Sequence, residues 1–130
     1  MSYQFQNDSP IYAQIVDRFK RDIARGALLP GERVTPVREL ALTLGVSLNT
    51  LQRALTDLER EGLLYTERTA GRFVTTDRSQ ADILRRALSE RTAQTYVEAL
   101  RDMNFTDGDI LALTQRTLEP HTNKKEEDTP

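Results

Sequence analysis

Polar side chains that can pair with DNA bases occur at helical spacing in one short segment, GVSLNTLQRALTDL, residues 45–58. Asn and Gln can each form two hydrogen bonds with adenine, and Arg can do the same with guanine. Asn49, Gln52 and Arg53 supply these groups, and Leu48 can contact a thymine methyl group. A helix with these side chains near its start is therefore suited to reading base edges in the major groove.

The same segment also fits an amphipathic helix whose polar side only faces water. Leu51, Ala54, Leu55 and Leu58 recur at helical spacing and form its apolar face. Every surface helix of this type presents polar residues on its other side. Periodicity alone therefore leaves both interpretations open, and the neighbouring elements must decide between them.

Residues for enzyme chemistry are scarce in this chain. It has no cysteine and one histidine, His121, in the polar segment EPHTNKKEEDTP. The HExxH, GxSxG, GxGxxG and P-loop motifs are absent from the sequence. We interpret His121 as solvent-exposed and expect no enzyme activity, no metal site and no cofactor.

Length and composition predict a soluble, cytoplasmic protein. The 130 residues allow one compact core and a small appendage. No apolar run approaches the roughly 18 residues that span a bilayer, and the first residues do not resemble a secretory signal. Residues 1–76 hold 10 basic and 9 acidic residues, against 8 and 11 in residues 77–130, which sums to the net charge of −2. This asymmetry favours nucleic-acid binding by the first part only weakly.

Turn and capping residues predict two helices before the segment 45–58. The first begins at Ser9 and Pro10, with Ser9 as its N-cap, and ends at Gly26. The second runs from about Pro36 to Leu44, with Thr35 as its N-cap. Tyr12, Ile15, Phe19 and Ile23 form the apolar face of the first, and Val37, Leu40, Ala41 and Leu44 that of the second.

A helix-turn-helix and a hairpin follow from the next signals. Gly45 permits a tight turn, and Ser47 can cap a third helix that ends near Glu61. The β-branched and aromatic residues of LLYTE and RFVTT predict two strands joined by RTAG, and residues 33–34 could add a short strand. The expected fold class is α+β, mostly α: an N-terminal winged helix-turn-helix followed by a short C-terminal two-helix segment.

Two further helices are expected after residue 76. The polar stretch SERT, residues 89–92, predicts a bend or a change of neighbours in the first of them. Thr106 and Asp109 can form a capping box at the start of the second, with Phe105 packing on Ile110. We expect disorder after Pro120.

The segment 9–76 resembles the DNA-binding domain of GntR-family transcriptional regulators. The resemblance rests on PIYAQI, LPGERV, VRELA, GVSLNTLQRAL, LEREGLL and GRFV, in this order and spacing. It implies that the polar side of the third helix reads DNA and that the hairpin forms a wing along the minor groove. The implied DNA-binding residues are Arg38, Ser47, Leu48, Asn49, Thr50, Gln52, Arg53, Arg68, Thr69, Gly71 and Arg72.

Three departures from the family pattern bear on these residues. Thr35-Pro36 replaces the usual Pro-Ser or Pro-Ala before Val37, so a family capping serine is missing. Thr69 stands where the wing usually has another glycine, which predicts a stiffer or differently shaped tip. Arg72 replaces a small residue, so its charge either strengthens phosphate binding or is a solvated charge at the strand edge.

The short second part resembles the YtrA-like branch of the family, in which two helices serve mainly for dimerisation. About 40 residues cannot enclose a metabolite-sized cavity alone. Their apolar residues exceed what a two-helix hairpin buries by itself, although some could pack on the first domain. The expected dimerisation residues are Leu84, Leu88, Tyr96, Leu100, Ile110, Leu113 and Leu118.

These inferences divide the chain into a DNA-binding domain, residues 1–76, a dimerisation segment, residues 77–119, and a tail, residues 120–130. The expected function is that of a homodimeric transcriptional regulator, a repressor, bound to a palindromic DNA operator. The alternative is a winged-helix module for protein–protein contact without DNA, which the acidic pI of about 5.5 favours. The sequence identifies neither the operator nor a small-molecule effector.

Overall fold

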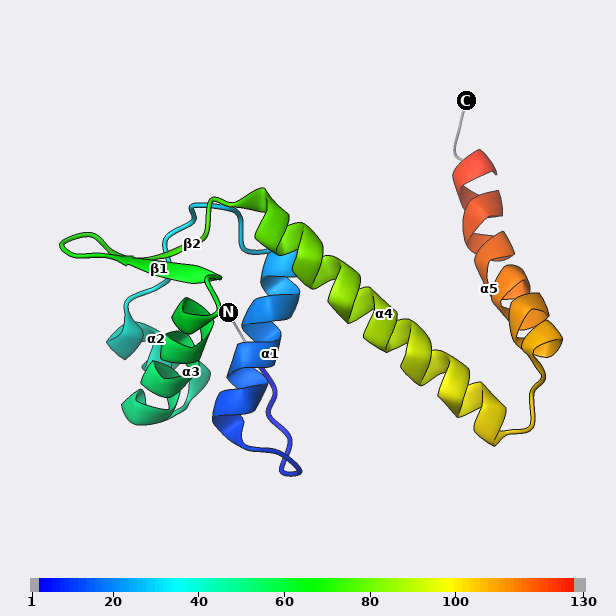
Figure 1. The fold of residues 1–130 in the computed structure, drawn as a ribbon, viewed down its shortest axis with the longest axis horizontal. Coiled ribbons are helices and arrows are strands. Elements are labelled where there is room, and N and C mark those ends of the chain that lie inside the picture. The colour runs from blue at the N-terminus through cyan, green and yellow to red at the C-terminus, as the bar shows by residue number, and fades with distance from the viewer. Residues whose placement is uncertain (1–2, 128–130) are drawn as a thin grey trace. The chain divides into compact units, whose positions relative to one another are not determined.

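The computed structural model describes residues 3–127, and the side chains of residues 3–119. Within this range the elements are α1 (Ile11–Ala24), α2 (Val37–Leu44), α3 (Leu48–Arg60), β1 (Leu64–Glu67), β2 (Gly71–Val74), α4 (Arg78–Asp102) and α5 (Asp107–Glu127) (Figure 1). The chain forms two compact units, Met1–Leu88 and Ser89–Pro130. The mostly helical fold class, with a winged helix-turn-helix first, is confirmed.

The turn between α2 and α3 depends on Gly45. This residue has a φ of +69°, a left-handed conformation that glycine adopts without a steric penalty. The backbone N–H of Val46 then donates to the carbonyl of Ala41 over 3.1 Å, which closes the end of α2. Ser47 caps α3 as expected, because its Oγ accepts the backbone N–H of Thr50.

The expected caps of the first two helices are wrong by one residue. Pro10 and Pro36 occupy the N-cap positions of α1 and α2, and neither Ser9 nor Thr35 makes a capping hydrogen bond. The two prolines have ψ angles of 141°, which belong to extended backbone rather than to a helix. At α1, the side-chain amide of Gln14 instead holds the preceding segment, with hydrogen bonds of 2.8 Å to the backbone of Gln6 and Ser9.

The wing is an antiparallel hairpin in which Tyr65 lies opposite Phe73. Their rings are stacked, with centroids 5.7 Å apart. Arg33 forms an isolated bridge with Phe73, and the N–H of Val34 donates to the carbonyl of Arg72 over 2.8 Å. The short strand expected at residues 33–34 is therefore present as a single bridge that supports β2.

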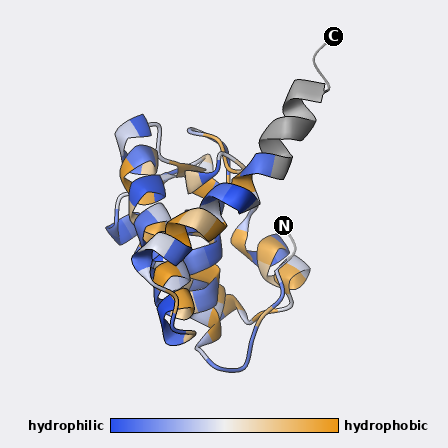
Figure 2. Cartoon of the chain, turned by 90° about the vertical axis from the view of Figure 1, so that its right-hand side faces the viewer, coloured by the Kyte–Doolittle hydropathy of each residue, from blue (hydrophilic) through white to orange (hydrophobic). Residues whose placement is uncertain are grey.

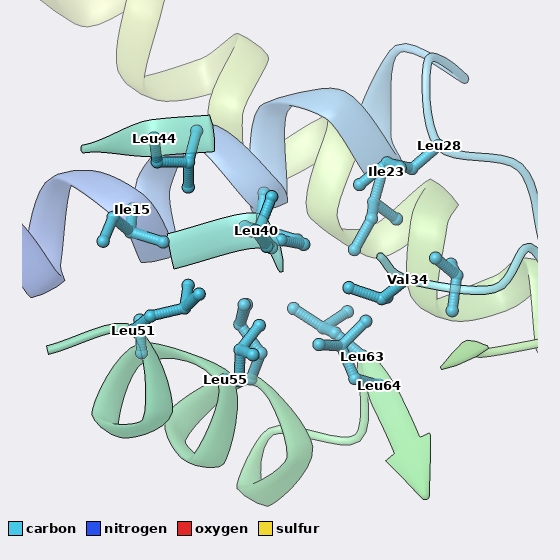
Figure 3. Close-up of a cluster of buried hydrophobic side chains, with 14 of the residues drawn as sticks. Ile15, Ile23, Leu28, Val34, Leu40, Leu44, Leu51, Leu55, Leu63 and Leu64 are labelled. Atoms are coloured by element: carbon cyan, nitrogen blue, oxygen red, sulfur yellow. The ribbon is translucent and has the colours of Figure 1, made fainter. Parts of the chain in front are cut away.

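One hydrophobic core joins α1, α2, α3 and the hairpin. Leu51 and Leu55 point from α3 toward Ile15 and Leu40 (Figure 3). The side chains below 2% exposure are Phe19, Ile15, Leu40, Leu51, Leu55, Leu58 and Val74. Close packing of these groups fixes the orientation of α3, so its opposite side has a defined direction.

The second unit contains α4 from Ser89 onward and the whole of α5. The stretch 89–92 lies inside the continuous helix α4, and the compact units divide at its first residue, as the expected change of neighbours requires. The capping box is confirmed: the Thr106 N–H donates to Asp109 over 3.0 Å, and the Asp109 N–H donates to the Thr106 hydroxyl over 3.1 Å. Hydrophobic and hydrophilic residues are interspersed along the helices (Figure 2).

Three expectations concern the end of the chain and special sites. Helix α5 continues to Glu127, so the predicted tail begins inside it and ends outside the described residues. The division at residues 76 and 119 stays a prediction, and the side chain of His121 is not among those described. Among the described residues, no helix has the length and apolar character needed to cross a membrane, and no acidic or histidine cluster suits a metal ion.

Candidate nucleic-acid interface

The outer side of α3 presents Asn49, Gln52 and Arg53 to solvent. On its inner side, Leu51, Ala54 and the following leucines are completely buried. Consecutive residues of a helix point about 100° apart, so Leu51 faces the core while Gln52 faces solvent. The helix cannot rotate without exposing the core. Asn49 and Gln52 are held in a fixed direction and keep their amide groups available for hydrogen bonds.

Ser47 and Thr50, both expected to contact DNA, are bonded to each other. The Ser47 hydroxyl donates to the Thr50 Oγ1 over 2.7 Å and accepts the Thr50 backbone N–H over 3.1 Å. Each hydroxyl thus has a local structural partner at the start of α3. Leu48 is half-buried and packs partly against the core, so only part of its side chain is open to a thymine methyl group.

Arg53 stacks on an aromatic ring of α1. Its guanidinium carbon lies 3.6 Å from the centre of the Tyr12 ring, which is a close cation–π contact. The guanidinium donors lie in its own plane, so a ring against its face does not block them. Tyr12 therefore orients the Arg53 guanidinium group, and the N–H groups in its plane stay available to donate hydrogen bonds.

Three exposed arginines of the first unit have no acidic partner among the described residues. Arg38 on α2, Arg53 on α3 and Arg68 in the wing are exposed, and within residues 3–119 none has a carboxylate at ion-pair distance. Elsewhere in the first unit, ion pairs join Lys20–Glu61, Arg21–Asp17, Arg25–Asp22, Arg60–Asp57 and Arg85–Asp82. An unpaired arginine can neutralise a DNA phosphate without first breaking an ion pair with a carboxylate.

The tip of the wing is shaped by Gly71 and Arg33. Gly71 has a φ of +108°, and a Cβ there would lie 3.3 Å from the Arg33 Nε, so a side chain would both strain the backbone and crowd Arg33. The Arg33 Nε donates to the carbonyl of Ala70 over 3.0 Å. This contact holds the turn that exposes Arg68 and Thr69.

Arg72 is neither free nor solvated. Its Nε lies 2.7 Å from the Glu59 Oε1 of α3, and the Thr66 hydroxyl donates to the same oxygen. Burial acts to raise the pKa of Glu59, but the hydrogen bonds from Thr66 and Arg72 and the Arg72 charge outweigh it and hold the pKa below its usual value. The Arg72 charge is thus paired within the domain, and its contact with phosphate stays a prediction.

Comparison with known proteins connects this geometry to a family. A family model described as "Bacterial regulatory proteins, gntR family" matches residues 11–74. Over 111 residues the chain is 33% identical to the uncharacterized HTH-type transcriptional regulator YhcF of Bacillus subtilis, covering 85% of this chain and 92% of that protein. The chain belongs to the gntR family.

Other GntR relatives extend this result. The HTH-type transcriptional repressor YtrA of Bacillus subtilis is 36% identical over 69 residues, which are 53% of either protein. A GntR-family transcriptional regulator from Listeria monocytogenes superposes with a TM-score of 0.78 at 28% identity, covering 86% of this chain and 98% of that one. The DNA-binding domain of AraR in complex with operator ORX1 superposes with a TM-score of 0.51 at 32% identity, covering 58% and 95%. This GntR protein is thus a DNA-binding transcription regulator and not an enzyme.

The residues predicted for dimerisation fall into different environments in this GntR chain. Leu84 packs partly against the core of the winged domain. Leu100 and Ile110 are 8% and 7% exposed, so they are already buried within one chain. Tyr96 is 38% exposed and its hydroxyl lies 2.8 Å from the Thr114 Oγ1, whereas Leu118 is 61% exposed. Leu88 and Leu113 are half-buried.

Three residues that support the interface were not predicted from the sequence. Tyr12 was assigned only to the core face of α1 and Arg33 only to a short strand, and Glu59 was given no role. Each acts through a contact between elements distant in the sequence: Tyr12 with Arg53, Arg33 with Ala70, and Glu59 with Arg72. The sequence signal for the last of these contacts was the replacement of a small residue by Arg72, which was attributed to phosphate binding or to a solvated charge.

Proposed function

We propose that this GntR protein is a cytoplasmic, homodimeric repressor that binds a palindromic operator. The observation that carries the proposal is the fixed direction of Asn49 and Gln52 on a helix whose other side is completely buried. A helix presented in this way can enter the major groove, where amide side chains distinguish adenine from the other bases. The similarity to the repressor YtrA over 69 residues supports repression rather than activation.

The wing supplies the second contact in this proposal. Arg68 and Thr69 are exposed at its tip, and the helices add the exposed, unpaired Arg38 and Arg53. An arginine at a hairpin tip fits the narrow minor groove, and arginines around a reading helix contact phosphates. In this arrangement Asn49 and Gln52 specify sequence, while the arginines supply affinity and position.

Dimerisation would place two such units on one operator. The second unit exposes apolar side chains that its own helices do not cover, notably Met103 at 62% and Leu111 at 72%. Burying them against a second copy would be favoured by the hydrophobic effect. A twofold dimer recognises two inverted half-sites whose centres lie about one helical turn, 34–36 Å, or a multiple of it apart.

Selection from a random pool of DNA duplexes tests this function directly. We expect the protein to enrich sequences with two inverted half-sites, and the operator so obtained should reduce transcription when placed next to a promoter. Light scattering should give twice the chain mass of 14.8 kDa. Failure to enrich any duplex would favour the protein-contact module, and enrichment of single, asymmetric sites would contradict the palindrome.

Replacing Gln52 by Ala should change base preference rather than weaken all binding. The variant loses a pair of hydrogen bonds at one position of each half-site, which we expect to remove about 1–3 kcal/mol of discrimination at that base pair. Competition among operators that differ at single positions measures this effect. Gln115→Ala, at an exposed position of α5, is the control that should leave preference unchanged. An equal loss of affinity for every operator would make Gln52 a positioning residue.

Replacing Arg38 by Ala should weaken binding to all sequences alike. An arginine on phosphate adds affinity through counterion release, so its loss should reduce the slope of log affinity against log salt concentration by about 1. Titrations of the selected operator at several salt concentrations give the slope. Arg21→Ala removes a cation paired with Asp17 and should leave the slope unchanged. An unaltered slope for Arg38→Ala would exclude the phosphate contact.

A further inference from the structure

Glu59 links the reading helix to both strands of the wing. Its Oε1 accepts a hydrogen bond from the hydroxyl of Thr66 in β1. The same oxygen accepts a hydrogen bond from the Arg72 Nε in β2 over 2.7 Å. The Glu59 and Arg72 side chains are 28% and 21% exposed, so the pair is more shielded from water than the neighbouring pair of Arg60 and Asp57, at 73% and 30%. Partial shielding strengthens a charge-assisted hydrogen bond.

The position of this link matters because a two-stranded hairpin is weakly stable by itself. The inner end of the wing is held by the core residues Leu64 and Val74. Its outer part depends on the Tyr65–Phe73 stack, on Arg33 beneath the turn, and on Glu59. Of these contacts, only Glu59 is a residue of the reading helix itself.

We propose that Arg72 is a positioning residue: together with Glu59 it fixes the wing relative to α3, so that the minor-groove and major-groove contacts are presented to DNA as one rigid surface. This inference rests on the proposed function, because it concerns the same DNA complex. Ordering the wing before binding reduces the conformational entropy lost in the complex, which increases affinity without adding a contact to DNA.

The competing role for Arg72 is a direct contact with phosphate, and the two roles predict opposite effects of neutralising Glu59. If Arg72 binds phosphate, Glu59 competes with the DNA, and Glu59→Gln should tighten binding by releasing Arg72 and by removing a negative charge. If Arg72 positions the wing, Glu59→Gln breaks the link and should weaken binding. The sign of this effect therefore distinguishes the roles.

The experiment compares Glu59→Gln, Arg72→Thr and the double variant on a duplex that the wild-type protein has selected from a random pool. We expect each single variant to weaken binding about 5- to 30-fold and the double variant to bind no worse than either single one, because the same coupling is lost each time. Hydroxyl-radical cleavage of the duplex should lose protection at the minor groove, while the major-groove contacts of α3 persist.

Controls separate this effect from simple unfolding and from a general charge effect. Asp57→Asn and Arg60→Thr remove the neighbouring ion pair of α3, which does not include the wing, and should leave minor-groove protection intact. Thermal unfolding of each variant shows that the domain is folded under the binding conditions. Tighter binding by Glu59→Gln, or additive losses in the double variant, would overturn the inference. If wild-type protein selects no duplex at all, the proposed function fails before this comparison begins.

Discussion

Replacing Leu51 by Ala is expected to lower the free energy of unfolding by about 2–5 kcal/mol, because it removes a completely buried side chain and leaves a cavity. Leu51 lies on α3 and points toward the core residues Ile15 and Leu40 (Figure 3). The surrounding side chains are themselves closely packed and can fill the space only in part. Urea unfolding followed by circular dichroism, at one fixed protein concentration, measures the change.

Leu42→Ala is the matched control for this experiment. Leu42 belongs to α2, close to the same core, but its side chain is 85% exposed. Truncating it should change the free energy of unfolding by no more than about 0.5 kcal/mol. Equal effects of the two substitutions would mean that Leu51 does not have the buried position described here.

Replacing Leu111 by Asp is expected to convert the proposed dimer into a monomer and to weaken operator binding by about 10²–10⁴-fold, the range that joining two binding modules contributes. A carboxylate at the centre of an apolar contact between subunits would lose water without gaining a partner. Leu111 is 72% exposed in the single chain, so the substitution leaves the chain's own packing intact. Light scattering gives the mass, and titration of the selected duplex gives the affinity.

The corresponding control is Leu42→Asp, which adds the same charge at an exposed leucine outside the second unit. It should leave the molecular mass at that of the dimer. Leu100, in contrast, is 8% exposed, so a charge there would test the folding of the helical hairpin rather than association. A dimer mass for Leu111→Asp would contradict the proposed interface.

The sequence was sufficient for the winged helix because its signals are local and agree with one another. The apolar face of α3, the left-handed Gly45 and the capping Ser47 all define the same turn between two helices. The capping box of Thr106 and Asp109 is equally local and was also predictable. Contacts that span three or four residues can be read from spacing alone.

The errors have two physical causes. Ser9 and Thr35 are good capping residues by type, but the proline after each of them takes the N-cap position with extended backbone, so the helix begins one residue later. The sequence predicted no partner within the domain for Arg72, which was assigned to DNA or to solvent, although it pairs with Glu59. Their pairing depends on the register of the hairpin against α3, which no local pattern encodes.

In the candidate site, too, local sequence patterns predicted the exposed residues of one helix but not the contacts between helices. Asn49 and Gln52 were predicted from their types and spacing, and both are exposed on α3. The position of Arg53 could not be derived in this way, because it depends on how closely α1 and α3 pack. The dimerisation residues stay a prediction, since an apolar residue such as Leu100, buried in the single chain, is equally suited to the hairpin and to a subunit interface.

The stacking of Arg53 on Tyr12 has a thermodynamic consequence. A free arginine side chain has about 2 kcal/mol of rotamer entropy to lose when it is immobilised. Because the ring already holds the guanidinium, much of that entropy has been lost during folding, before any DNA is present. If Arg53 donates hydrogen bonds to DNA, each bond it forms therefore adds more to affinity than the same bond from a mobile side chain.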